Sequence, residues 1–302
     1  AASFKPSALL VSAIEHPCVL KPALQLTRQG WQNQIVTVDG QGRLDFSSFN
    51  EGIATKPKLV SVMLANNETG VIQDIPALAS AARASGAWFH SDAVQALGKL
   101  PIDFRALNAA GVHALTLSAH KAYGPKGAAA LVMDKRVEIQ PQIAGGGHER
   151  GLRSGTENVA AIVGFGVAAE LAARRVAEQQ SSLESMREQL ESGILALGGQ
   201  IFGRGTPRLA NTSYFAFPNI DGETLVGKLD RTGFAVASGA ACSSANPEPS
   251  HVLRAMGVAP DLARGAVRVS LGRGNQTAQI DEFIKALRAT LDSLQGLTAL
   301  AA

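Results

Sequence analysis

The sequence has few cysteines and few charged residues, and it lacks long apolar runs. Its 302 residues include two cysteines, Cys18 and Cys242, too few for a disulfide framework, so a reducing compartment such as the cytoplasm is expected. No stretch approaches the roughly 18 apolar residues that a membrane-spanning helix requires. The 28 basic and 25 acidic residues are scattered along the chain, without a block of one sign. The composition therefore predicts a protein that contacts neither membranes nor nucleic acid directly.

Hydrophobic residues are plentiful, at 46% of the chain, and are enough for one large or two ordinary domains. In the first half, short apolar runs alternate with segments of helical spacing, which is typical of crossover units that build a mostly parallel sheet with helices on both faces. The predicted strands are Ala8–Ile14, Leu59–Leu64, Ala87–His90, Ala114–Leu117 and Gly127–Met133, and the predicted helices are Cys18–Arg28, Ile75–Ala84 and Phe104–Ala110.

The second half begins after the loop GGGHERGLR at 145–153. We expect an α/β large domain over 1–157, a long helical connection over 158–200 that is interrupted near 179–182, and a smaller α+β domain over 201–302. The small domain has predicted strands at Asn211–Phe217, Phe234–Ser238 and Ala266–Leu271, and predicted helices at Gly222–Asp230, Ser250–Met256 and Ile280–Gln295.

Lys121 follows a predicted strand, in the run Ser118-Ala119-His120-Lys121. The carboxyl ends of parallel strands are where open α/β sheets bind ligands, so this amine is expected to face a crevice. Partial burial can lower the pKa of such a lysine and make it a Schiff-base former. A lone lysine is more often an ordinary surface residue, so a functional role for Lys121 depends on which residues lie near it.

Asp92 ends the preceding predicted strand, and Gln95 lies three residues further on. A buried carboxylate is costly unless it meets a positive group, and the protonated ring nitrogen of pyridoxal phosphate would be such a group. Gln95 is near enough in sequence to hydrogen-bond the same ring. The alternative is that Asp92 is the N-cap of a helix that follows it. A third strand end carries Asn67 in the run NNETG, which alone indicates no more than a turn.

Several runs of ten or more residues closely resemble, in matching order, the cysteine desulfurases of the NifS/IscS type, a pyridoxal phosphate-dependent branch of aminotransferase class V. The runs are NNETGVIQDI, HSDAVQALGKLPIDF, LSAHKAYGPKGAAAL, GGGHERGLRSGTENV and EPSHVLRAMG. The resemblance extends from about Ala8 to near the C-terminus, and it implies the fold-type I architecture of pyridoxal phosphate enzymes.

The resemblance also implies roles for residues of the large domain. Lys121 would hold the cofactor covalently, Asp92 would pair with the pyridine nitrogen, and Gln95 would contact the ring hydroxyl. His16 would stack on the ring and move protons, Ser118 and His120 would contact the phosphate, and Asn67 would also contact the cofactor. Thr156 would reach the cofactor phosphate of a neighbouring subunit, which implies a homodimer. No metal site is expected, because His148 and Glu149 beside three glycines are too few ligands for zinc.

Cys242 lies among small residues, in a loop from Ala237 to Asn246 that we expect to be mobile. A single cysteine is usually an inert core residue, but the composition of this loop and the resemblance favour a thiol that takes up sulfur and passes it on. Cys18 lacks such surroundings and is expected to be structural. Arg268 alternates with apolar neighbours. The resemblance assigns it, with Asn67, to the substrate α-carboxylate, and outward exposure is the alternative.

The implied activity is the removal of sulfur from L-cysteine, giving alanine and a persulfide on Cys242. Its acceptor would be an iron–sulfur cluster scaffold or a tRNA thiolation factor. A selenocysteine lyase and a cofactor-free relative that binds or regulates partners remain alternatives. Members of the family begin with a further segment whose glycine- and threonine-bearing loop contacts the cofactor phosphate. This sequence starts after that segment, and we expect it to be a fragment.

Overall fold

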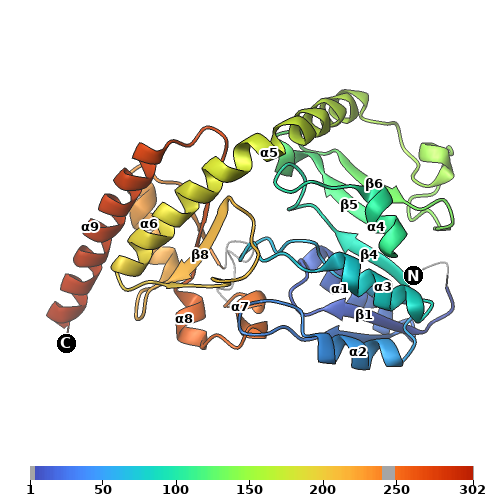
Figure 1. Cartoon of the computed structure of the whole chain (residues 1–302), viewed down its shortest axis with the longest axis horizontal. Helices are drawn as coiled ribbons and strands as arrows, with labels where there is room; N and C mark the ends of the chain where they lie inside the picture. Colours follow the sequence, from blue (N-terminus) through green and yellow to red (C-terminus); the bar gives the residue numbers. More distant parts are fainter. Residues whose placement is uncertain (1–3, 240–248, 302) are drawn as a thin grey trace. The chain divides into compact units, whose positions relative to one another are not determined.

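The computed structural model describes residues 4–239 and 249–301. The chain forms two compact units (Figure 1). Unit 1 comprises Ala1–Thr37, Leu44–Ala65 and Gln73–Ala177, and unit 2 comprises Val38–Arg43, Asn66–Ile72 and Glu178–Ala302. The domain limits expected from the sequence stay predictions.

Unit 1 is built on a sheet that has six strands among the described residues, in the order β2-β1-β3-β4-β5-β6. Neighbouring strands are parallel, except that β6 runs antiparallel to β5. The mostly parallel sheet is therefore confirmed. The strands are β1 Ala8–Ser12, β2 Gln32–Val36, β3 Leu59–Ser61, β4 Trp88–Asp92, β5 Ala114–Ser118 and β6 Ala129–Met133.

Helices cover both faces of this sheet, because successive residues of a strand point to opposite sides. In β1, Leu10 packs into a core with Phe49 and Leu78, whereas Leu9 and Val11 pack with Ala23 on the other side. The helices of unit 1 are α1 Pro17–Thr27, α2 Phe46–Ala54, α3 Ile75–Ala84 and α4 Phe104–Ala110, with the 3-10 turns η1 Ala119–Ala122 and η2 Glu149–Gly151.

Helix α5, Val159–Ala196, is a single continuous helix of 38 residues. The interruption expected near 179–182 is wrong, because the run Gln-Gln-Ser-Ser there is polar but contains neither proline nor glycine. The helix begins in unit 1 and ends in unit 2.

Unit 2 holds a four-stranded antiparallel sheet among its described residues, in the order β7-β8-β10-β9. Its core joins Leu190 of α5, Phe215 of β8, Leu225 of α6, Val267 of β10 and Leu287 of α9. The strands are β7 Gln200–Ile201, β8 Thr212–Ala216, β9 Ala237–Ser238 and β10 Val267–Ser270, and the helices are α6 Gly222–Arg231, α7 His251–Ala255, α8 Pro260–Arg264 and α9 Thr277–Ala301. Within the described ranges, no helix has the length and apolar character needed to cross a bilayer.

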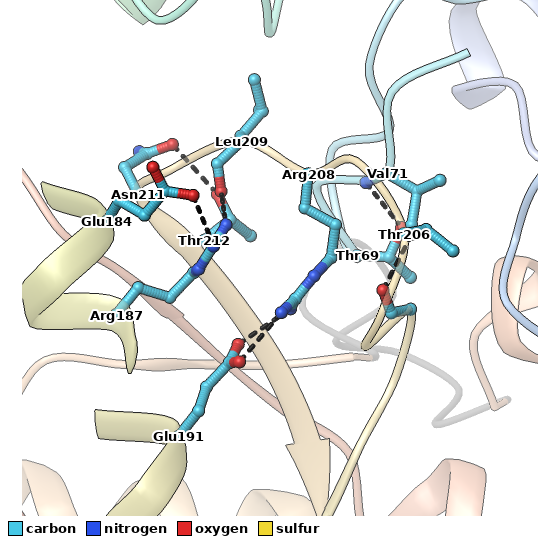
Figure 2. A network of polar contacts seen from close by, with 11 residues as sticks. Thr69, Val71, Glu184, Arg187, Glu191, Thr206, Arg208, Leu209, Asn211 and Thr212 are labelled. Carbon is cyan, nitrogen blue, oxygen red and sulfur yellow. Dashed lines mark hydrogen bonds and ion pairs between the residues drawn. The ribbon is translucent and has the colours of Figure 1, made fainter. Parts of the chain in front are cut away.

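A buried ion pair fixes the start of β8 within unit 2 (Figure 2). Both guanidinium Nη atoms of Arg208 lie 2.8 Å from the carboxylate oxygens of Glu191 on α5, and the two side chains are 4% and 8% exposed. Arg208 forms a β-bridge with Val71, and the Leu209 N–H donates to the Gly70 carbonyl at 2.8 Å. The pair thus holds the short segment Asn66–Ile72 against the rest of unit 2.

Candidate active site

Three of the predicted site residues follow parallel strands of unit 1 at one edge of its sheet. His16 caps α1 shortly after β1, Asp92 is the last residue of β4, and Lys121 lies in η1 directly after β5. Because β1, β4 and β5 run in the same direction, their carboxyl ends share this edge. This is the position where open α/β sheets bind ligands.

Asp92 is 5% exposed, and its two carboxylate oxygens differ in their surroundings. Oδ1 accepts the Val94 N–H at 2.9 Å, but residues 93–100 form turns and not a helix, so the alternative that Asp92 is a helix N-cap is wrong. Oδ2 has the Cys18 thiol 3.9 Å away, and a thiol is a weak donor. One oxygen therefore anchors the carboxylate, and the other is available to a stronger, positively charged donor.

Cys18 was expected to be structural, and the structure places it exposed at the start of α1, outside the core. Loss of water around its sulfur, together with the negative charges of Asp92 and Glu15, raises the pKa of the thiol to about 11. Cys18 therefore stays protonated at neutral pH and is a poor nucleophile.

Glu15, which the sequence motifs did not single out, fixes the turn that presents His16. Its side chain is fully buried, and Oε1 accepts the Ser12 hydroxyl at 2.7 Å and the Met63 N–H at 2.5 Å. Burial outweighs these hydrogen bonds and raises the pKa of Glu15 to about 8. The next residue, His16, accepts the Cys18 N–H on Nδ1 at 3.2 Å as the N-cap of α1.

His90 forms a second polar feature beneath this edge. Its Nδ1 lies 2.8 Å from the Ser61 hydroxyl and its Nε2 lies 3.3 Å from the Thr116 hydroxyl, so it links β3, β4 and β5. Burial lowers the pKa of His90 to about 4, and the ring is therefore neutral. Since His90 and Asp92 are two residues apart in β4, they share a face of the sheet. The spacing His90-x-Asp92 in the sequence could have indicated that His90 lies on the same face of the sheet as Asp92.

The remaining predicted residues of unit 1 are less buried. Lys121 is exposed, so the partial burial expected for it is wrong. The Ser118 hydroxyl lies 2.8 Å from His120 Nδ1, and the two form a polar pair beside Lys121. The Gln95 side-chain oxygen accepts the Lys99 ammonium at 2.8 Å, and Thr156 is exposed between η2 and α5.

In unit 2, Asn67 and Arg268 are in contact, and their role in substrate binding stays a prediction. Asn67 lies in a tight turn in which the Asn66 side-chain oxygen accepts the N–H groups of Glu68 and Thr69, each at 2.9 Å. Arg268 is partly buried in β10, and its Nη1 donates to the Asn67 carbonyl at 2.8 Å. Its side chain therefore turns inward, and outward exposure is excluded.

Comparison with known proteins agrees with this geometry. Residues 4–283 match the aminotransferase class V family. A cysteine desulfurase of Bradyrhizobium diazoefficiens is 44% identical over 92% of this chain and 70% of its own length. The chain belongs to the cysteine desulfurases of aminotransferase class V. Among solved structures, a NifS-like protein superposes with a TM-score of 0.88 at 36% identity, covering 95% of this chain and 75% of its own. SspA in complex with cysteine has a TM-score of 0.73 at 30% identity, covering 89% and 74%.

Cysteine desulfurases of this family imply pyridoxal phosphate, and the donor set in unit 1 fits that group. The buried Asp92 carboxylate with its weakly bonded Oδ2 suits a pyridinium N–H, and the exposed Lys121 amine suits an aldehyde. The predicted sulfur carrier Cys242 lies outside the described residues, and the mobility expected for its loop therefore stays a prediction. Across 4–239 and 249–301, no three His, Cys, Asp or Glu side chains are grouped so that they could hold a metal ion.

Proposed function

We propose that this chain removes sulfur from L-cysteine with pyridoxal phosphate, releases alanine and carries the sulfur as a persulfide on Cys242. The observation that supports this most strongly is the buried Asp92 carboxylate at the edge of the sheet that also carries Lys121. When bound, pyridoxal phosphate supplies an aldehyde and an electron-accepting ring.

The residues of unit 1 take the cofactor roles in this proposal. Asp92 holds the ring nitrogen through Oδ2, while the Val94 N–H keeps Oδ1 in place. Lys121 would hold the cofactor through its aldehyde group and would move the α-proton of the substrate. His16 would lie against the ring and move protons, and Gln95 would contact the ring hydroxyl. Ser118 and His120, which contact each other, would hold the phosphate together with Thr156 of the neighbouring subunit.

In unit 2, Arg268 binds the α-carboxylate of the substrate, because its planar guanidinium suits a carboxylate and is already oriented by the Asn67 carbonyl. The Cys242 thiolate then attacks the substrate sulfur. An S–S bond forms as the C–S bond breaks, and the electron pair of that bond stays on the carbon skeleton. This skeleton is protonated and leaves as alanine.

We propose a homodimer, because α5 exposes an apolar stripe at its start. Val159, Ile162, Val163 and Val167 are between 46% and 64% exposed and recur at helical spacing. Exposed apolar surface of this kind is typical of protein interfaces. We further propose a cytoplasmic location, in keeping with the low cysteine count, and transfer of sulfur to an iron–sulfur scaffold or a tRNA thiolation factor.

Two matched pairs of variants test the proposal on protein purified after growth with pyridoxine. Borohydride should fix the cofactor to the wild type and to Lys126→Ala, a neighbouring exposed lysine, but not to Lys121→Ala. Cys242→Ser should keep the visible absorption band and lose alanine formation from cysteine, whereas Cys18→Ser should keep both. A fixed cofactor in Lys121→Ala, or alanine formation by Cys242→Ser, would refute the assigned roles.

A further inference from the structure

Glu68 is a partly buried acid beside the proposed substrate site, and neither the motifs nor the roles above use it. It lies next to Asn67 in the turn Asn66–Gly70. The Ser250 hydroxyl donates to Glu68 Oε2, and the same hydroxyl accepts the N–H groups of Val252 and Leu253 at 3.1 and 3.2 Å as the N-cap of α7. The Glu68 carboxyl is thus held in one place.

Four groups of unit 2 that titrate, carry charge or donate face this carboxyl. They are Ser250 and His251 from α7, Arg268 from β10 and the fully buried Tyr214 from β8. Burial raises the pKa of Glu68, and the Ser250 hydrogen bond and the electrostatic interactions with His251 and Arg268 lower it by less. The pKa of Tyr214 is also raised, first by burial and then by the charge of Glu68. Arg268 therefore helps to stabilise a carboxylate that burial disfavours.

Arg268 is also the group assigned to the substrate. Its Nη1 is used by the Asn67 carbonyl, and its Nε is buried without a hydrogen-bond partner among the described residues. An α-carboxylate that binds this guanidinium brings a second negative charge close to Glu68. A nearby like charge favours the neutral form of a carboxyl group that is already poorly solvated.

Resting on the function proposed above, we propose that Glu68 is the counter-ion of Arg268 in the free enzyme and takes up a proton from solvent when the substrate carboxylate binds. Glu68 is then a positioning residue that couples substrate affinity to pH. Where Glu68 is already protonated, the substrate carboxylate meets no competing charge. Where Glu68 is ionised, substrate binding must also protonate Glu68, so the affinity for the substrate falls as pH rises.

The experiment measures proton uptake by titration calorimetry of the cofactor-loaded full chain with L-alanine, the proposed product. Alanine carries the same carboxylate but no thiol that would titrate. Titrations in phosphate and in Tris give the number of protons bound per alanine, because the two buffers have different ionisation heats. Glu68→Gln is the test variant, since its side-chain oxygen can still accept from Ser250. Glu282→Gln, an exposed acid on α9, is the matched control.

We expect the wild type and Glu282→Gln to bind more protons per alanine than Glu68→Gln. The affinity of Glu68→Gln should exceed that of the wild type about fivefold at an alkaline pH, where Glu68 is ionised, and this difference should shrink at a lower pH, where Glu68 is protonated. Equal proton numbers in all three proteins, or weaker alanine binding by Glu68→Gln at both pH values, would overturn the proposal. A wild type that forms no alanine from cysteine would instead overturn the proposed function.

A second measurement needs no ligand. Because burial raises the pKa of Glu68, the folded protein holds a proton that the unfolded chain releases, so Glu68 makes stability fall as pH rises above its ordinary pKa. Urea unfolding should show a shallower fall for Glu68→Gln than for the wild type and Glu282→Gln. Identical pH profiles would contradict the raised pKa of Glu68, on which proton uptake depends.

Discussion

The buried pair between Arg208 and Glu191 should dominate the stability of unit 2, and Glu191→Gln tests this. The substitution keeps the shape of the side chain but leaves the Arg208 guanidinium, 4% exposed, without its counter-ion. Arg187 makes this worse, because burial and the charge of Arg208 already lower its pKa while Glu191 opposes them. Removing one partner of a buried pair costs about 3–5 kcal/mol, and we expect a loss in this range.

The control is an exposed pair on the same helix. Arg174 and Glu170 are in contact, but their side chains are 71% and 61% exposed, so Glu170→Gln should cost no more than about 0.5 kcal/mol. Urea unfolding followed by circular dichroism measures both losses, as shifts in the midpoint at constant slope. Replacing both partners, as Glu191→Leu with Arg208→Met, should recover most of the stability. A loss for Glu191→Gln as small as that of the control would refute the reasoning.

Three further predictions concern unit 1. The pKa of Glu15 is raised from 4.5 to about 8, so between these pH values the folded state holds a proton that the unfolded chain releases, and the stability of the wild type should fall as pH rises. Glu15→Gln should reduce this fall in urea unfolding. A pH dependence of stability equal to that of the wild type would contradict the raised pKa. Asp92→Asn should weaken pyridoxal phosphate binding about ten- to a hundredfold in a fluorescence titration, because a charge-assisted hydrogen bond becomes neutral, and unchanged affinity would count against the pyridinium role. Val163→Asp should give a monomer in light scattering while Ser181→Asp, exposed further along α5, stays dimeric, and a dimeric Val163→Asp would place the interface elsewhere.

The sheet of unit 1 was largely predictable, because most of its strands are short apolar runs with few alternatives. Strand β2, Gln32–Val36, was missed since three of its five residues are polar amides at an edge of the sheet. The break expected in α5 was wrong for a related reason. Polar composition indicated a loop, whereas only residues that disrupt the backbone would have ended the helix.

The acids Glu15 and Glu68 were missed although each adjoins a motif residue. What makes them notable is burial, and distant partners create it. Met63 lies 48 positions from Glu15, and Ser250 lies 182 positions from Glu68. The sequence pattern placed Arg268 in a strand but did not show whether its side chain points inward or outward. The hydrogen bond to the Asn67 carbonyl shows that it points inward. The sequence thus predicts where the strands end, but it does not predict the burial and charges that shift the pKa values of the acids beside them.

The interleaving of the two units has a consequence for protein engineering. The polypeptide passes from one unit to the other at five points, and Asn66–Ile72, with Asn67 and Glu68, is a seven-residue excursion from unit 1 into unit 2. A chimera that joins two homologues at a single junction within α5 would pair the excursion of one parent with the Arg268, Tyr214 and Ser250 of the other. Recombination of substrate preference between relatives therefore has to transplant this excursion together with the C-terminal half.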